Sequence, residues 1–378
     1  MSIFVGRVCV NCVMDESDPL ISFDEKGVCN HCKEYKEKAT KKLLPPNHRE
    51  IEFKRIISKI QVEGKGKKYD CILGISGGAD SSYMAYISKK NGLRPLIVHF
   101  DNGWNSELAV SNIEKVLTKL NFSLNTFVID WEEFKDLQLA YLKASVIDIE
   151  IISDHLISGV LYKLAAENKI KYILSGHNIV TEAILPNSWV HNKQDAINIK
   201  DIHKKYGKIK LKNYPFFSSV KSKKYINLKG IKIIDILNYI DYNKRKAKQI
   251  LKDELGWRDY GGKHYESVFT RFFQGYILPT KFNVDKRKAH LSTLICSGQI
   301  TREEALQELE KPIYDAEQLK IDKEFVLKKL GLTEEEFEDI MKQKPVPHSH
   351  FKVGSGSIYD EYKWLKPFKP ILSSIKRK

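Results

Sequence analysis

The sequence lacks the features that would place it in a membrane or outside the cell. No run of 18 apolar residues occurs among its 378 residues, so we expect no membrane-spanning helix. The start, MSIFVGRVCVNC, has no basic stretch followed by a long apolar one, so we expect no signal peptide. Six cysteines are too few to cross-link so long a chain with disulfides, which favours a reducing, cytoplasmic location.

The amino-acid composition is ordinary for a globular protein, except for the net charge. Apolar residues make up 42% and charged residues 29%, and the length fits two or three domains. The formal net charge is +15, which suggests an anionic partner such as a nucleic acid, a nucleotide or a nucleotide-sugar. Residues 200–252 contain 16 Lys and Arg but only three Asp and Glu. We predict that this stretch forms one basic surface.

Apolar runs of strand length alternate with longer helical patterns from Tyr69 onwards. This alternation predicts βαβ units, and therefore an α/β fold with a doubly wound parallel sheet. The predicted strands are 71–75, 95–100, 127–130 and 171–174, and the predicted helices are 80–90, 106–120, 152–168 and 234–252.

The whole sequence divides into four predicted segments. We expect a cysteine-bearing module over 1–40, a helix and linker over 41–68, the α/β domain over 69–260 and a mostly helical C-terminal region over 261–378. Capping-box patterns begin at Thr301 and Thr333, and Gly331 is placed to end a helix.

Four cysteines near the start have the spacing of a zinc site. Cys9 and Cys12 form one C-x2-C pair, and Cys29 and Cys32 form a second pair after 16 intervening residues. Two such turns can close a tetrahedron of thiolates around one ion, and a short segment with little core needs such a clamp. Because four thiolates leave no open position, we predict a structural zinc. The alternatives are two surface thiol pairs or a redox motif.

An apolar strand pattern runs into the turn Ser76-Gly-Gly-Ala-Asp-Ser-Ser82, and a helical pattern follows. The two glycines allow several backbone N–H groups to point at one spot, and the helix N-terminus adds its positive end, so this turn predicts an anion site. The Walker string G-x4-G-K-[ST] is absent from the chain. Asp80 would repel a phosphate unless a divalent cation bridged the two. The alternative is an ordinary strand–helix turn capped by Asp80 or Ser81.

The turn resembles the phosphate loop of the PP-loop ATP pyrophosphatases, which cleave ATP between its α and β phosphates. The resemblance implies a nucleotide site formed by Ser76, Gly77, Gly78, Asp80, Ser81 and Ser82, with magnesium at Asp80 and catalytic roles for Ser76 and Asp80. It also implies that Asp101, in the stretch after the second strand, lies by the adenosine. A second nucleotide loop would include Gly176 and His177, after the fourth strand.

The chain resembles, more narrowly, the N-acetyl sugar amidotransferases of the WbpG/PseA type, from bacterial surface-polysaccharide pathways such as lipopolysaccharide O-antigen synthesis. The resemblance covers almost the whole chain. It lies in the cysteine module, the phosphate loop, LGWRDYGGKHYES from Leu255, DKRKAHLS from Asp285 and ICSGQ from Ile295. It implies that ATP adenylylates the oxygen of a sugar acetamido group, and that ammonia then displaces AMP to leave an acetamidino group.

Charged residues of the second half are candidates for the sugar site under this resemblance. Lys263 and Lys286 are the candidate catalytic residues, and His264, Glu266, Arg271 and Arg287 are the candidate substrate-binding residues. Glu182 is a further candidate for magnesium. For any one of these residues, the alternative is a solvated surface charge.

No cysteine is placed to act as a glutaminase nucleophile. Residue 2 is a serine, four cysteines are assigned to zinc, and Cys71 and Cys296 lie in apolar patterns where we expect them to pack. We therefore expect a separate glutaminase to supply ammonia. The family resemblance implies a partner like the glutaminase subunit of imidazole-glycerol-phosphate synthase, with its cyclase-like subunit.

Two other functions fit part of the sequence. A PP-loop tRNA-modifying enzyme of the thiolase kind would also suit a zinc module and a net charge of +15. Only two cysteines remain for thiolation chemistry, which counts against it. The second alternative is a zinc-containing scaffold without catalytic activity, and the intact Ser-Gly-Gly-x-Asp-Ser turn counts against that.

Overall fold

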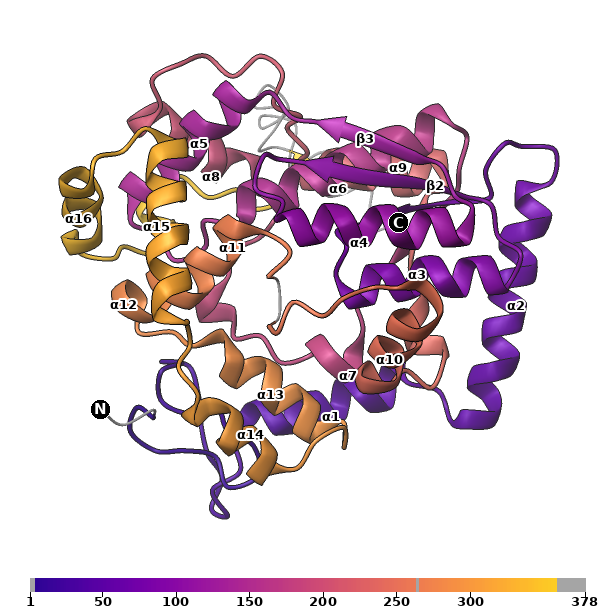
Figure 1. Ribbon diagram of the computed structural model, residues 1–378, viewed down its shortest axis with the longest axis horizontal. Helices are drawn as coiled ribbons and strands as arrows, with labels where there is room; N and C mark the ends of the chain where they lie inside the picture. The colour runs from indigo at the N-terminus through magenta and orange to yellow at the C-terminus, as the bar shows by residue number, and fades with distance from the viewer. Residues whose placement is uncertain (1–3, 263–264, 359–378) are drawn as a thin grey trace, which may run out of the picture.

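A parallel five-stranded sheet forms the centre of the computed structural model, which describes residues 4–262 and 265–358 (Figure 1). The strand order is β3-β2-β1-β4-β5, and every neighbouring pair is parallel. The strands are β1 Cys71–Gly74, β2 Pro95–Asp101, β3 Leu124–Val128, β4 Tyr172–Ser175 and β5 Lys232–Asp235. In such a sheet the chain switches direction between β1 and β4, where ligands of open α/β folds bind.

Helices cover both faces of the sheet, as a doubly wound fold requires. One face carries α3 (Ala79–Lys90), α4 (Glu107–Leu120) and α10 (Lys244–Leu255), and the other carries α6 (Ile151–Glu167) and α9 (Ser219–Lys229). Side chains of β1 alternate accordingly. Cys71 and Leu73 are buried on the α3 side, and Ile72 is buried on the α6 side. The predicted fold class is confirmed.

Two edge strands differ from the sequence prediction. The third strand starts at Leu124 rather than at 127, and β5 lies where we predicted the start of a helix. Both are edge strands with exposed residues, among them Leu124, Val128 and Ile233. A strand exposed in this way has no continuous apolar run to mark it, so its periodicity is weak.

The predicted basic surface of residues 200–252 is divided in the structure. α8 (Ala196–Tyr206) packs on α5 (Trp131–Ala144), and α9 packs on α6. α10, which carries the last basic residues of the stretch, packs on α3 and α4 across the sheet. The prediction of one basic surface was therefore wrong, because β5 carries the chain from one face of the sheet to the other.

The other helices flank this core. They are α1 Asn30–Lys42, α2 Pro46–Gly64, α7 Ile179–Glu182, α11 Val268–Phe272, α12 Leu278–Phe282, α13 Lys286–Cys296, α14 Arg302–Glu310, α15 Ala316–Leu330 and α16 Glu334–Lys342. A π-helical turn, Phe273–Ile277, joins α11 to α12. Single 3-10 turns cover Asn187–Trp189, Ile236–Tyr239 and His348–His350. No helix within the described ranges is long and apolar enough to span a bilayer.

The C-terminal region is helical, as predicted. Thr301 and Thr333 each form the expected capping box, at the starts of α14 and α16. Gly331 ends α15 in the left-handed conformation, with φ +70°. α13 contacts both α7 and α1, so this region joins the sheet domain to the N-terminal module (Figure 1).

Candidate functional site

The turn at residues 76–82, named the phosphate loop after the motif it resembles, lies between β1 and α3, at the carboxyl edge of the sheet. Its serines brace the turn, since the Ser76 N–H donates to Ser81 Oγ (3.2 Å) and the Gly78 N–H donates to Ser76 Oγ (3.3 Å). Gly78 caps α3, whose first turn contains Asp80. The loop thus places serine hydroxyls and the positive end of a helix at one point, as an anion site requires.

The carbonyl of Gly77 is held from outside the loop. Trp257 Nε1–H donates to it at 2.7 Å, and the Tyr260 hydroxyl donates at 3.0 Å. Gly77 has φ +83°, and a Cβ there would lie 2.8 Å from the Ala109 carbonyl oxygen, so only glycine fits. Burial raises the pKa of Tyr260, which keeps this hydroxyl protonated as a donor. The aromatic residues of the LGWRDYGG stretch therefore fix the shape of the turn.

Asp80 is paired with two residues that the sequence analysis missed. The Tyr242 hydroxyl donates to its carboxylate, and Lys244 Nζ lies 3.3 Å from it. Burial would lower the pKa of Lys244, but the carboxylates of Asp80, Glu182 and Glu266 outweigh it and raise the pKa. Lys244 is thus a cation at the phosphate loop. It was hidden because its stretch of sequence contains many lysines.

Two further carboxylates surround this pair. Glu266 Oε1 would be 3.2 Å from a Cβ placed on Gly78, so its carboxylate lies against the loop. Burial raises the pKa of the Tyr242 hydroxyl, and the carboxylates of Asp80 and Glu182 raise it further. The same two carboxylates raise the pKa of Lys244. Oxygen ligands of this kind are the ones that magnesium prefers, so the donor set suits that ion.

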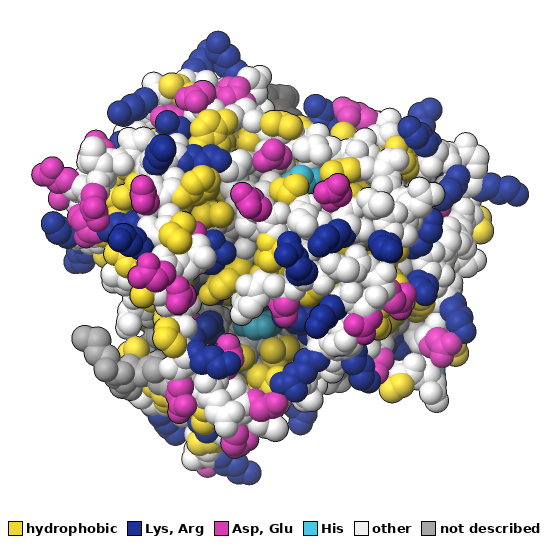
Figure 2. All heavy atoms as spheres, viewed as in Figure 1, with side chains coloured by type: hydrophobic (Ala, Val, Ile, Leu, Met, Phe, Trp, Pro, Cys, Tyr) yellow, Lys and Arg dark blue, Asp and Glu magenta, His cyan; other side chains and the backbone are white. Residues whose placement is uncertain are grey.

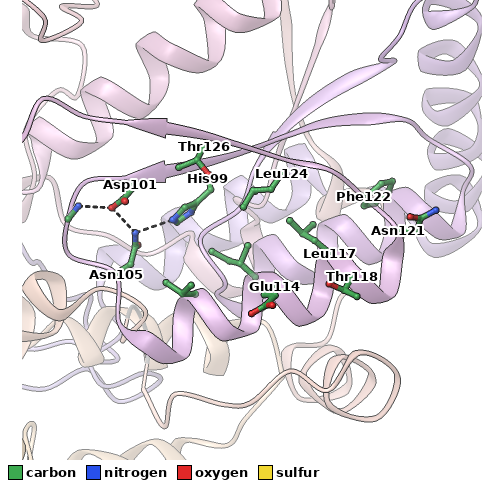
Figure 3. Close-up of a pocket in the computed structure, with 13 residues that line it drawn as sticks. His99, Asp101, Asn105, Glu114, Leu117, Thr118, Asn121, Phe122, Leu124 and Thr126 are labelled. Atoms are coloured by element: carbon green, nitrogen blue, oxygen red, sulfur yellow. Dashed lines mark hydrogen bonds between the residues drawn. The ribbon is translucent and has the colours of Figure 1, made fainter.

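A network of hydrogen bonds joins the loop to the end of β2. His99 Nδ1 is 3.0 Å from the Ile75 carbonyl, and its Nε2 is 3.0 Å from Asn105 Nδ2. A carbonyl only accepts, so Nδ1 carries the proton and Nε2 accepts from the Asn105 amide. Asn105 also donates to Asp101 Oδ1 at 3.3 Å (Figure 3). Asp101 is therefore connected to the phosphate loop through two side chains.

A cavity of about 740 Å³ opens beside this network, between α4 and strands β2 and β3 (Figure 3). Its polar end is formed by His99, Asp101 and Asn105, and its walls include Ile113 and Leu117. The Ile113 side chain would lie 3.3 Å from a Cβ on Gly77, so the cavity begins at the phosphate loop. Its size is in the range of small-molecule sites.

The loop after β4 approaches the phosphate loop from the other side. A Cβ on Gly176 would lie 3.6 Å from Asp80 Cβ, so the two loops are in contact. Asn178 caps α7 by accepting from the Thr181 N–H at 2.9 Å. His177 is half-exposed, with Nδ1 4.0 Å from Asp235 Oδ2 at the end of β5. The structure thus brings Asp80 and Gly176 together, with His177 beside them at the same edge.

The C-terminal region is fastened across this edge of the sheet. The Ser106 N–H donates to the Glu266 carbonyl at 2.9 Å, and the Val268 N–H donates to the Trp104 carbonyl at 2.8 Å. Figure 2 shows a hollow in the lower half of this face, with basic side chains at its rim. The candidate site is therefore closed by residues that lie far from the phosphate loop in the sequence.

The predicted sugar-site residues differ in where they lie and in what they contact. Lys286, the first residue of α13, pairs with Glu150 at 3.1 Å, at the start of α6. Arg271 binds the Asp322 carboxylate through two nitrogens, at 2.6 and 2.9 Å. Arg287 binds the Asp285 carboxylate and backbone carbonyls of residues 308, 309 and 311. Both arginines are thus engaged within the fold. Lys263 and His264 lie outside the described residues.

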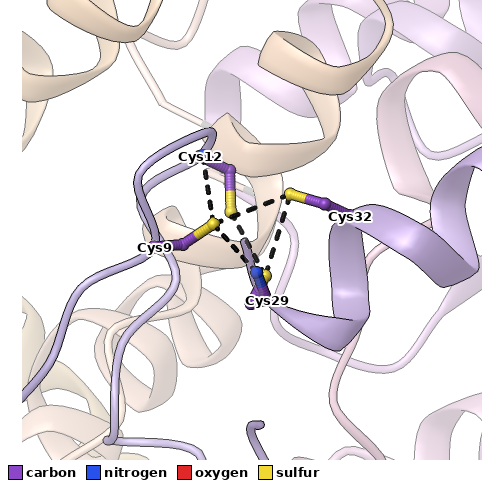
Figure 4. A group of neighbouring side chains, drawn as sticks. All are labelled: Cys9, Cys12, Cys29 and Cys32. Atoms are coloured by element: carbon purple, nitrogen blue, oxygen red, sulfur yellow. Dashed lines mark hydrogen bonds between the residues drawn. The ribbon is translucent and has the colours of Figure 1, made fainter. Parts of the chain in front are cut away.

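The four N-terminal cysteines converge on one point (Figure 4). Their sulfur–sulfur distances include 3.8 Å for Cys9–Cys32 and 3.7 Å for both Cys12–Cys29 and Cys29–Cys32. A tetrahedron with metal–sulfur bonds of about 2.3 Å has edges of about 3.8 Å, so the thiols fit a zinc ion. All four are buried, which suits a structural site.

The cysteine module packs on α13 and α14. Arg302 donates to the carbonyls of Cys9 (3.2 Å) and Cys12 (3.1 Å), and the Val13 N–H donates to Ser292 Oγ at 3.2 Å. A buried ion pair joins Lys288 to Asp15 at 2.5 Å. The module therefore supports the helix that begins with Lys286.

Comparison with known proteins identifies the C-terminal region. Residues 266–366 match the model of the C-terminal domain of WbpG-like lipopolysaccharide biosynthesis proteins. The chain thus carries a WbpG-like C-terminal domain, as the sequence resemblance implied. An uncharacterized protein of Methanocaldococcus jannaschii is 25% identical over 316 residues, which are 81% of this chain and 92% of that protein.

Solved structures give distant matches. The NH3-dependent NAD synthetase of Campylobacter jejuni has a TM-score of 0.30 at 14% identity, covering 58% of this chain and 97% of its own. The U34-tRNA thiolase of Methanococcus maripaludis, solved with its [4Fe-4S] cluster, has a TM-score of 0.32 at 14% identity, covering 81% and 89%. The fold assignment rests on the order and direction of the strands themselves.

Proposed function

We propose that the protein is an ATP-dependent amidotransferase that converts the acetamido group of a bacterial surface-polysaccharide sugar to an acetamidino group. The observation that carries this proposal is the phosphate loop at Ser76–Ser81, with Asp80 and Lys244 beside it and a WbpG-like domain closing the same edge of the sheet. A nucleotide-sugar and a nonulosonic acid are both substrates that this proposal allows.

ATP would lie across the carboxyl edge of the sheet. Its pyrophosphate would occupy the loop, and the cavity at His99 and Asp101 would receive the nucleoside. Asp80, assisted by Glu182 and Glu266, would hold magnesium, which would neutralise the charge on the departing pyrophosphate. Lys244, whose Nζ lies 3.3 Å from the Asp80 carboxylate, would contact the phosphates when ATP binds, because it is a cation beside the loop.

The chemistry follows from the weakness of an amide as an electrophile. The amide oxygen attacks the α-phosphorus of ATP, the bond to pyrophosphate breaks, and an O-adenylyl imidate forms. Ammonia adds to the imidate carbon and loses one proton, and AMP leaves with the former amide oxygen. The chain has to align the amide with the α-phosphate and keep water out, which is a task of positioning.

The sugar would bind between the phosphate loop and α13. Lys286, with Glu150 beside it, lies at the start of that helix. Lys263 and His264 stay proposed sugar-site residues on the sequence resemblance alone. Arg271 and Arg287 would support this wall, because their guanidinium groups already bind carboxylates of the chain. Lys286 is thus the strongest candidate for contact with an acidic sugar.

Ammonia would come from a separate glutaminase. Cys71 is fully buried in β1, where burial raises the pKa of its thiol, and Cys296 lies against the cysteine cluster. The Cys296 sulfur contacts the Asn11 amide and the Cys32 sulfur, which is not the environment of a histidine-activated nucleophile. We therefore retain the proposal of a partner like the glutaminase subunit of imidazole-glycerol-phosphate synthase, with its cyclase-like subunit.

The test is ATP–pyrophosphate exchange, measured with a panel of acetamido nucleotide-sugars and nonulosonic acids. We expect exchange that depends on one class of sugar, and AMP as the nucleotide product when ammonia is added. Release of ADP and orthophosphate would contradict the proposal. Exchange that depends on tRNA, with no response to any sugar, would favour the tRNA-modifying alternative.

A further inference from the structure

A fifth thiol lies beside the four-cysteine cluster. Cys296, the last residue of α13, has its Sγ 3.7 Å from Cys32 Sγ. The Asn11 amide spans the two sulfurs, at 3.3 Å from Cys32 and 3.9 Å from Cys296. The apolar pattern around Cys296 predicted only packing, and the contact with Cys32, 264 positions away, was not foreseen from the sequence.

Cys296 differs from the four clustered cysteines in exposure. Cys9, Cys12 and Cys29 are completely buried and Cys32 is 7% exposed, whereas Cys296 is only partly buried. Cys296 is also outside the group of four whose ligand atoms all lie within 4.8 Å of one another. An oxidant can therefore reach the four-cysteine site at the sulfur of Cys296, which is not one of the four sulfurs placed to bind a metal.

We propose that Cys296 and Cys32 form a peroxide-sensitive pair whose oxidation to a disulfide releases the metal. Hydrogen peroxide or an alkyl hydroperoxide oxidises one thiolate of the pair to a sulfenic acid and is itself reduced to water or an alcohol. The other thiolate attacks that sulfur, the S–O bond breaks and a second water leaves. Two thiols lose two electrons in total, and the peroxide accepts them. Cys32 is then lost as a ligand.

The position of the pair gives oxidation a route to the candidate active site. α13 begins with Lys286, which pairs with Glu150, and ends with Cys296 beside the four-cysteine cluster. The cysteine module is also held to α13 through Ser292 and Lys288. Release of the metal would loosen this packing, so the wall of the site would respond to oxidation.

The experiment uses full-length protein loaded with one equivalent of Zn²⁺ and treated with hydrogen peroxide. Zinc release is followed with a chromogenic chelator, and the first disulfide is mapped by peptide mass spectrometry at partial oxidation. We expect a Cys32–Cys296 disulfide that accumulates in step with zinc release. Cys296→Ser should release zinc at least about 10-fold more slowly, because the more accessible thiol of the pair is gone.

Cys71→Ala is the matched control, since Cys71 is a cysteine fully buried in β1 and should not affect the rate. Equal rates of release from the wild type and Cys296→Ser would overturn the proposal. A first disulfide within the group of four would also overturn it. The disulfide mapping uses the wild type alone, so its result does not depend on how well the variant folds. Neither disulfide mapping nor zinc release requires the sugar reaction.

Discussion

The four-cysteine module and the edge of the sheet at the phosphate loop are built in opposite ways. The four cysteines lie within 24 residues of sequence, and their sulfurs all lie within 4.8 Å of one another. This edge of the sheet joins Asp80 to Lys244 and Gly77 to Trp257, in each case across more than 160 positions of sequence. A metal site that stands in for a hydrophobic core can be formed by residues that are close together in the sequence. A site at the edge of a parallel sheet is instead formed by residues from several crossover connections.

The largest effect should come from breaking the module. We expect Cys12→Ser to lose zinc and to lower the free energy of unfolding by at least about 3 kcal/mol, because metal binding and folding are coupled in such sites. Chemical denaturation and metal analysis measure this. Cys71→Ala, which removes a buried sulfur from β1, should cost about 1 kcal/mol and leave the zinc in place. A stable, metal-free Cys12→Ser protein would show that the module folds without its clamp.

The next effect concerns the edge of the sheet at the phosphate loop. Asp80→Asn should slow ATP–pyrophosphate exchange by roughly 100- to 1,000-fold, because the loop loses the charge that is proposed to hold magnesium. Its unfolding free energy should change little. Asp253→Asn, an exposed acid on α10, should behave as the wild type. Unchanged exchange in Asp80→Asn would remove the proposed role of this carboxylate.

A smaller effect should follow from Lys244→Met. We expect about 10- to 100-fold weaker use of ATP, seen mainly in the KM for ATP, because one charge-assisted contact to phosphate is lost. Lys246→Met, two residues along the same helix and exposed, is the control. Equal kinetics for the two variants would mean that Lys244 only balances Asp80 and does not reach the nucleotide.

The smallest effect should come from the hydrogen bonds of Trp257 and Tyr260 to the Gly77 carbonyl. Trp257→Phe removes one of two hydrogen bonds to the Gly77 carbonyl, which we expect to cost about 1 kcal/mol and to weaken ATP binding about fivefold. Trp189→Phe is a fitting control, since the buried Trp189 Nε1 has no partner within the described part of the chain. Its ATP affinity should be unchanged. Tighter binding in Trp257→Phe would mean that these hydrogen bonds strain the loop.

The contrast between a site formed by neighbouring residues and a site formed by distant ones explains which features could be predicted from the sequence. The cysteine spacing, the Ser76–Ser82 turn and the central strands were found because each is a local pattern. The strand at 232–235 was missed because an exposed edge strand in a basic stretch has no apolar signature. Tyr242, Lys244 and the bond from Trp257 to Gly77 were missed because only the crossover past β5 brings them to Asp80.

The proposed amidotransferase reaction requires the turn after β1 to bind the two terminal phosphates of ATP with magnesium. Titration of inorganic pyrophosphate and Mg²⁺ into the protein, followed by calorimetry, tests this without a sugar. We expect saturable binding that requires Mg²⁺ and is weakened at least about 100-fold by Asp80→Asn. An absence of binding, or equal affinity in that variant, would contradict the account.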